Sequence, residues 1–350
     1  MNKLGIKAVA ALIVSAVAAI AAASASPTSA ASTEAGRPRP VITDVRTVAA
    51  FDSAAGQEPE SVSIAQDGSL IVSMLGFLVG KPPELVQVSP SGQQTILVTG
   101  PVGDAIGGNV IGRDGTIIYN VVSPDPSRSG VWRLPPYGAA QRITAMPAGQ
   151  FLNGLTLDSS NRTLYVADSV AGTIWAIPAS GGPATEWLVG PALAPSPSGN
   201  GIGANGVEYH NGAVWFSNTD QGTLLRVPVT ASGAPGPIQL IADNLAGIDD
   251  FELLSGRSDV AFVALNFQNK LAVVYPNGRT RIVLDASNGL NSPTDAAISR
   301  TQIYITNSGI AAPNNASLQA GEIDIGALFD GDNLAKRITD ETTPTWRGTY

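Results

Sequence analysis

Cysteine is absent from this 350-residue chain, and histidine occurs once, at His210. Without cysteine no disulfide forms, and a single histidine argues against a zinc or copper site. His210 stands beside Asn211-Gly212, a strong hairpin-turn signal, so we expect it on the surface and not as the base of a Ser-His-Asp triad. The chemistry that remains is that of carboxylates, amides, hydroxyls and a hard cation.

Charged residues are also scarce. They make up 14% of the chain, with a formal net charge of −8, whereas glycine (38) and proline (25) are abundant. This composition suits many tight turns and few surface helices. An acidic surface repels phosphate backbones, so we expect no nucleic-acid partner.

The only long apolar run is at the N-terminus. Residues 1–25 combine Lys3 and Lys7, an apolar run and a small-x-small end, which predicts a secretory signal peptide; a retained anchor is the alternative. Cleavage would lower the net charge to −10 and leave a secreted or extracytoplasmic protein without a membrane association. Residues 26–40, rich in Ser, Ala and Pro, are expected to form a disordered leader.

A repeat organises the rest. Residues 151–177 read as three short strands separated by polar turns, and similar units begin near Glu60, Asn109, Asn205, Asp250 and Asp295. These points and Asn153 are 44 to 52 residues apart, which is typical of the four-stranded blades of a β-propeller. We therefore predict an all-β, six-bladed β-propeller over residues 41–330. The tail, 331–350, receives no function.

The segment Val41–Phe51 is strand-like but precedes the first complete unit. We expect it to form the outer strand of the sixth blade, beside a third strand at Glu322–Leu328, and so to close the ring. The alternative is an edge strand of the first blade. Loops at 74–83, 121–130 and 190–203 interrupt the regular alternation of short strands and turns. The loop at 190–203 either borders a site or simply connects two blades.

The first strand of each blade lines the channel of a propeller, so residues at their starts converge. Glu60, Asn153, Asn205 and Asp250 would supply two carboxylates and two amides, a donor set that suits calcium. The alternative is that Asn-Gly and Asp at these places only form turns. Asp249 precedes Asp250, and the sequence leaves open which of the two faces the channel.

Two motifs resemble the regucalcin/gluconolactonase family: Asn153-Gly154-Leu155 with TLYVADSVAGTIWAI, and Asn205-Gly206-Val207 with AVWFSN. The resemblance covers about residues 50–310. It implies a six-bladed propeller with one divalent metal in the channel, and its order of ligands falls on Glu60, Asn153, Asn205 and Asp250. The family's Pro-Asp-Gly is here Asp249-Asp250-Phe251, and no arginine matches its sugar-binding residues.

The leading hypothesis is a calcium-dependent hydrolase of a lactone or related cyclic ester, with Mn²⁺ or Mg²⁺ as other possible ions. Asp250 would act as the base, and Asn153 would help to hold the substrate. We expect a monomer with a small-molecule substrate. Two alternatives stay open. An isomerase, cyclase or strictosidine-synthase-like enzyme would use an apolar mouth near Phe77, Leu78, Phe151 and Phe251; an NHL-like propeller would only bind a partner.

Overall fold

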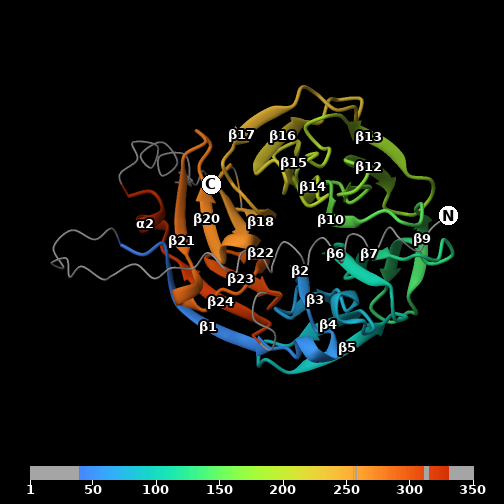
Figure 1. Ribbon diagram of the computed structural model, residues 1–350, viewed down its shortest axis with the longest axis horizontal. Coiled ribbons are helices and arrows are strands. Elements are labelled where there is room, and N and C mark those ends of the chain that lie inside the picture. Colours follow the sequence, from blue (N-terminus) through green and yellow to red (C-terminus); the bar gives the residue numbers. More distant parts are fainter. Residues whose placement is uncertain (1–38, 255, 257, 311–314, 331–350) are drawn as a thin grey trace, which may run out of the picture.

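The computed structural model describes residues 39–330 except 255, 257 and 311–314. Within that part the chain forms six four-stranded antiparallel sheets arranged as the blades of a β-propeller, as predicted (Figure 1). The predicted signal peptide (1–25), nearly all of the leader (26–40) and the tail (331–350) lie outside the described residues. No helix in the described ranges is long and apolar enough to cross a membrane.

The blades follow one another along the chain, and the first strand of each lies innermost. Blade 1 contains β2 (Pro59–Ile64), β3 (Leu70–Met74), β4 (Glu84–Val88) and β5 (Gln94–Thr99). Blade 2 contains β6 (Ala105–Ile111), β7 (Ile117–Val122), β8 (Gly130–Leu134) and β9 (Gln141–Ala145). Blade 3 contains β10 (Leu152–Leu157), β11 (Thr163–Asp168), β12 (Thr173–Pro178) and β13 (Thr185–Val189). Blade 4 contains β14 (Ala204–His210), β15 (Ala213–Asn218), β16 (Thr223–Pro228) and β17 (Gln239–Ala242). Blade 5 contains β18 (Ile248–Leu253), β19 (Ala261–Leu265), β20 (Lys270–Val274) and β21 (Thr280–Leu284). Blade 6 contains β22 (Pro293–Ser299), β23 (Gln302–Asn307), β24 (Ser317–Ile323) and β1 (Ile42–Ala50). Short helical turns are η1 (Ser53–Ala55), η2 (Phe77–Val79), η3 (Asn266–Gln268), η4 (Ala286–Asn288) and α2 (Ile325–Leu328).

The ring is closed by the N-terminal strand. β1 pairs antiparallel with β24 and becomes the outer strand of blade 6, which confirms the predicted closure and excludes the first-blade alternative (Figure 1). The predicted third strand at Glu322–Leu328 is wrong: that strand is β24. The Asp324 side chain accepts a hydrogen bond from the backbone N of Ala327 and caps α2, so the chain turns into a helix after Ile323.

The core lies between the blades. Six hydrophobic clusters are described, and each joins the facing sides of two neighbouring blades, including blade 6 with blade 1. Trp215 and Phe251, for example, are fully buried between blades 4 and 5. Burying a side chain of this size contributes about 1.5–3 kcal/mol, so most of the stability depends on completing the ring.

Every inner strand carries a β-bulge near its start, where the register with the second strand shifts. Asn153-Gly154 and Asn205-Gly206 occupy two of these bulges, inside β10 and β14, and not in turns. A bulge re-aims side chains, which places these residues toward the channel. A Cβ at Gly154 would lie 2.6 Å from the backbone N of Val207, so glycine is required by the close approach of the next blade.

Polar side chains of the second strands fix the bulges of the next blade. The Asn120 amide donates to the carbonyl of Asn153, and the Ser217 hydroxyl donates to the carbonyl of Asp249, at 2.7 and 2.6 Å. These bonds satisfy carbonyls that the bulges leave unpaired in the ladder. The channel side of each blade is therefore held by its neighbour.

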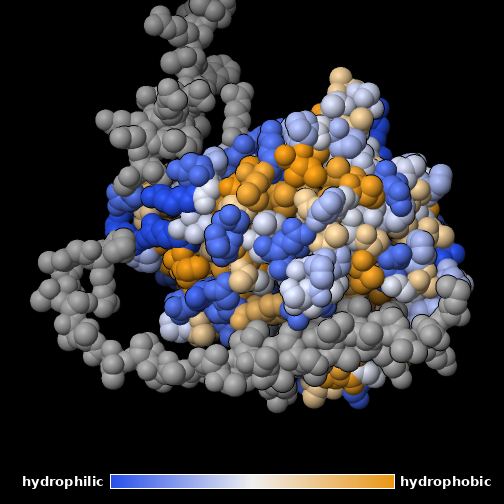
Figure 2. Space-filling model, turned by 45° about the horizontal axis from the view of Figure 1, so that its top comes forward, coloured by the Kyte–Doolittle hydropathy of each residue, from blue (hydrophilic) through white to orange (hydrophobic). Residues whose placement is uncertain are grey.

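The outer strands carry several exposed hydrophobic side chains, among them Ile96, Val189, Leu240 and Ile282. On the face seen in Figure 2, small hydrophobic patches are interrupted by hydrophilic side chains. Scattered exposure of this kind is ordinary for a protein surface and indicates no particular partner.

Candidate functional site

Five inner strands bring polar side chains to one pocket at the end of the channel where those strands begin. Glu60, Asn153, Asn205 and Asp249 line it, together with Thr294. The first three are the residues that the sequence indicated. The pocket encloses about 40 Å³, which is room for one ion or a water molecule but not for an organic substrate.

Asp250 does not join this set. It lines a different cavity farther along the channel, and Asp249 lies in the pocket in its place. The reason is the bulge of β18, between Ile248 and Phe251, which sends these two consecutive side chains to different parts of the channel. The placement expected for Asp250 is thereby corrected, and Asp249, the option left open by the sequence, is the aspartate beside Asn205.

The Asp249 carboxylate is held by two amides. Asn205 Nδ2 donates to its Oδ1 at 2.7 Å, and Asn266 Nδ2 donates to its Oδ2 at 3.0 Å. The pKa of Asp249 is raised to about 7, mainly by burial and also by the nearby charge of Asp295, although the hydrogen bonds from Asn205 and Asn266 act in the opposite direction. A carboxyl poised near neutral pH is suited to proton transfer.

Asn205 is oriented by its hydrogen bonds. Its Nδ2 also donates to Thr219 Oγ1 at 2.8 Å, and that hydroxyl donates to the carbonyl of Ile248. The side chain is 3% exposed, and its Oδ1 is buried without a hydrogen-bond partner in the described structure. A buried acceptor left unpaired costs about 1–3 kcal/mol, which a ligand or a cation at this oxygen would offset.

Glu60 completes the acidic pair. It is 8% exposed, and its pKa is raised well above the usual range, first by burial and then by the negative charges of Asp249, Asp295 and Glu58. Glu58 is buried as well, and burial raises its pKa to about 7. Two buried carboxylates repel one another unless a proton or a cation lies between them.

The oxygen donors of these residues match the chemistry of a hard divalent cation, which the resemblance of the two Asn-Gly motifs to the regucalcin/gluconolactonase family implies. Carboxylate and carboxamide oxygens are the ligands that calcium prefers, and Asn205 Oδ1 is an unused one. Among the described residues no three His, Cys, Asp or Glu side chains are grouped to hold one ion. A cation at this place would therefore depend on the amide oxygens of Asn153 and Asn205 as well as on Glu60 and Asp249.

The walls above the polar floor are apolar and come mostly from loops. They are formed by Leu75, Leu78, Phe151, Ile202, Phe267 and Ile310. The expectation of an apolar mouth holds for Leu78 and Phe151, and Phe77 packs edge-on against Phe151 at 6.1 Å between ring centroids. It is wrong for Phe251, which is fully buried between two blades.

The long loop 190–203 borders the pocket through Ile202, as one of the two interpretations of the sequence expected. The Asp220 carboxylate holds this loop in place by accepting hydrogen bonds from four backbone N–H groups, those of Ser196, Asn200, Gly201 and Ile202. The loop is therefore an ordered wall of the pocket. No sequence motif singled out Asp220, Thr219 or Asn266.

His210 lies at the far end of β14 and does not line the pocket. Its Nε2 is 2.8 Å from the carbonyl of Ser258 and 3.5 Å from the carboxylate of Asp259. The side chain is only 14% exposed, so the expectation of a solvated histidine is corrected, while its exclusion from a catalytic triad stands.

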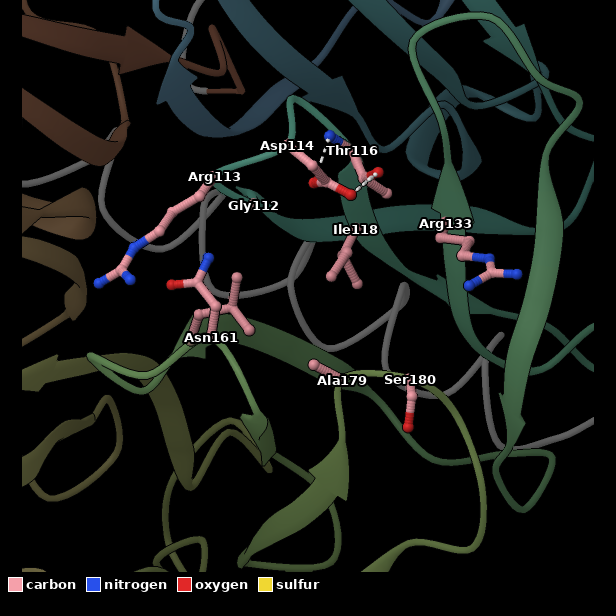
Figure 3. A pocket seen from close by; sticks show the side chains of 10 residues that line it. Gly112, Arg113, Asp114, Thr116, Ile118, Arg133, Asn161, Ala179 and Ser180 are labelled. Atoms are coloured by element: carbon pink, nitrogen blue, oxygen red, sulfur yellow. Dashed lines mark hydrogen bonds between the residues drawn. The ribbon is translucent and has the colours of Figure 1, made fainter.

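A separate pocket of about 370 Å³ lies between blades 2 and 3, at the opposite end of the inner strands (Figure 3). Arg113 and Arg133 are on opposite sides of it; Arg113 donates to the carbonyl of Ser159, and Asp114 accepts from Thr116. Because the two guanidinium groups do not converge, we assign this pocket no chemistry.

The fold and the pocket define a six-bladed propeller with a polar, acidic floor at one end of its channel. No protein-family model matches the chain, and no curated protein matches its sequence. Solved structures do resemble it. A gluconolactonase from Xanthomonas campestris is 14% identical with a TM-score of 0.61, covering 85% of this chain and 99% of its own. Virginiamycin B lyase from Staphylococcus aureus is 14% identical with a TM-score of 0.52, covering 80% and 99%. An auxiliary nutrient binding protein from Bacteroides ovatus is 12% identical with a TM-score of 0.62, covering 81% and 77%. At these identities the similarity concerns the fold alone.

Proposed function

We propose that the protein is a divalent-metal-dependent hydrolase of a lactone or related cyclic ester that acts outside the cytoplasm, with calcium as the expected ion. The observation that supports this most is the pairing of two buried carboxylates, Glu60 and Asp249, with the unpartnered Oδ1 of Asn205 beneath apolar walls. The similarity in fold to a gluconolactonase agrees with it. The N-terminal sequence motivates the location.

In this proposal each side chain has a defined task. Glu60, Asn153, Asn205 and Asp249 would hold the cation, which when bound supplies Lewis-acid polarisation of a carbonyl. Asp249 would take the proton of the attacking water, a role that was assigned to Asp250 from the sequence. Asn205 keeps the Asp249 carboxylate in place. Because the pocket itself holds only an ion or a water molecule, the substrate ring would lie at its mouth, where the apolar walls would contact it.

The test uses the purified full chain after chelation. A panel of lactones is assayed without metal and after addition of calcium, manganese or magnesium. We expect turnover only with metal, and a loss of at least about 100-fold in Asn205→Ala, about 2.7 kcal/mol. Asn277→Ala, which changes an exposed asparagine in a turn, is the control and should keep its activity. Full turnover after chelation would rule the proposal out.

The apolar walls favour a second candidate, an isomerase or a lyase that acts on a more apolar ring than a sugar lactone. Asp249 would then abstract a carbon-bound proton in place of a water proton. The two candidates differ in product mass, because hydrolysis adds one water and isomerisation adds none. A propeller that only binds its ligand would change no substrate and would bind it equally well after Asp249→Asn.

A further inference from the structure

The side chains around the pocket form two layers of opposite chemistry. The polar ones belong to the floor: each is the second residue of an inner strand or, like Thr219 and Asn266, directly follows a second strand. The walls consist of the six apolar side chains named above, and the described residues that line the pocket include no lysine or arginine. A ring held at the mouth therefore meets hydrogen-bonding side chains only on the side that faces the floor.

The wall that comes from blade 1 is a turn that closes on itself. After β3 the backbone N of Lys81 donates to the carbonyl of Gly76 at 2.9 Å. Gly76 has a φ of 69°, and a Cβ there would lie 2.5 Å from the carbonyl oxygen of Pro82, so glycine is required for this closure. The turn presents the half-buried side chain of Leu78 to the pocket. This wall is therefore apolar and already ordered without a ligand.

Blade 5 supplies an aromatic wall, the half-buried Phe267 in η3. A Cβ at Gly247 would lie 2.8 Å from the Cβ of Phe267, so glycine leaves the space that this side chain occupies. The backbone N of Asn266 donates to the carbonyl of Gly247 at 2.9 Å and fixes η3 there. Together with Ile202, whose loop Asp220 holds, ordered apolar walls come from three parts of the ring.

Such walls discriminate between lactones. Each hydroxyl of a polyhydroxylated lactone that lies against them loses hydrogen bonds to water and finds no side chain that replaces them. An alkyl substituent in the same place removes apolar surface from water on both partners. The comparison rests on the proposed hydrolase function, because it takes the carbonyl of a lactone to lie over the polar floor.

We propose that the substrate is a lactone whose ring carries an unbranched alkyl chain, and not a sugar lactone. The carbonyl lies over the floor, and the alkyl chain lies along the apolar walls of the mouth. Hydrolysis adds the oxygen of water to the carbonyl carbon, breaks the bond between that carbon and the ring oxygen, and leaves a proton on the ring oxygen. The product is a hydroxy acid that carries the alkyl chain.

The test measures kcat/KM of the calcium-loaded full chain for δ-valerolactone, δ-octalactone, δ-decalactone and glucono-δ-lactone, each corrected for spontaneous hydrolysis. Complete burial of one methylene would raise kcat/KM about fourfold, so we expect about twofold per methylene at a half-open mouth. The value for δ-decalactone should exceed those for δ-valerolactone and for glucono-δ-lactone at least about tenfold.

A variant of the wall tests which side chains contact the alkyl chain. Leu78→Ser should lower the ratio of kcat/KM for δ-decalactone to that for δ-valerolactone at least about threefold, because a hydroxyl replaces apolar wall. The matched control is Leu240→Ser, the same change at a leucine on β17 that is 59% exposed, and it should keep the ratio. Partial unfolding of a variant lowers both values equally and leaves their ratio unchanged.

Binding of lactams, which resist hydrolysis, separates the substrate class from the reaction. By calorimetry on the unchanged, calcium-loaded protein, 6-pentyl-2-piperidinone should bind at least about tenfold more tightly than 2-piperidinone. Metal-dependent turnover that favours glucono-δ-lactone, or that ignores chain length, would overturn the alkyl lactone and leave the hydrolase standing. Chain-dependent binding of the lactams without turnover of any lactone would overturn the hydrolase and keep the ligand class. Neither turnover nor chain-dependent binding would overturn both.

Discussion

The carboxyls of the channel predict an unusual pH dependence: without metal, the protein should be less stable at pH 8 than at pH 5. Burial raises the pKa of Glu252 to about 8 and that of Asp295 to about 7, and the charge of Asp295 adds to the shift of Glu252. Carboxyls with raised folded-state pKa values bind more protons folded than unfolded. Their ionisation therefore removes stability as the pH rises from about 4 to 8.

The size follows from Glu252 alone. Its pKa rises from 4.5 to about 8 on folding, and each pH unit across that window costs about 1.4 kcal/mol. Between pH 5 and 8 the loss is about 3 kcal/mol, a large part of the stability of an ordinary domain. Surface aspartates such as Asp114 and Asp285 have lowered pKa values, so the stability that they contribute is lost only below about pH 4. They do not mask the effect.

The assay is urea unfolding of the chelated full chain at pH 5, 6, 7 and 8 and constant ionic strength. Glu252→Gln should flatten the decline because it removes one group that must ionise, whereas Glu186→Gln, on the surface, should leave it unchanged. Calcium should restore stability at pH 8 by binding the folded state. A free energy of unfolding that stays constant or rises from pH 5 to 8 would refute the reasoning.

Three other perturbations test the site and the ring. Asp249→Asn should weaken calcium binding, measured by calorimetry, more than about 100-fold, which is about 2.7 kcal/mol. Asp250→Asn should weaken it less than about fivefold. The reverse order would mean that Asp250 and not Asp249 is the calcium ligand. Asp220→Ala leaves four backbone donors of the 190–203 loop without their acceptor, so limited proteolysis should cut this loop faster, while unchanged cleavage would show that the loop holds itself. Deleting residues 1–51 removes β1 and the buried Ile42 and Phe51 and should lower the melting temperature by about 10 °C or more; an unchanged value would mean that closure adds little.

The fold could be predicted because each blade repeats the same local signals. Alternating strands and turn residues recur at a period of 44 to 52 residues, and the lone strand at the N-terminus had only two edges to join. The site could be predicted to within one residue. Asn153 and Asn205 stand before glycine, which marks their bulges, whereas Asp249-Asp250 contains no such mark. A one-residue bulge moves each following side chain to the other face of the strand. Which of the two aspartates faces the pocket therefore depends on the register of β18 with β19.

Other parts of the site had no local signal. The sequence repeat equates Asn109 with Asn153, but the register places Gly107 at that position and Asn109 at the position of Leu155, after the bulge. Asn266 and Thr219 follow second strands and reach the site only because neighbouring blades meet. Contacts between blades depend on the closed ring, so the sequence of a single repeat does not predict them.

The bulge of β18 explains why the channel holds two acidic regions and not one. It sends Asp249 toward Asn205 and Asp250 toward Glu208 and Asp295, so consecutive aspartates serve different cavities. The pocket around Asp249 also contains a buried amide oxygen without a partner in the described structure, Oδ1 of Asn205. Uncompensated carboxyls and unpaired acceptors both cost stability, and an ordinary core would replace them with apolar side chains. Their occurrence in the channel supports the proposal that the pocket binds a cation.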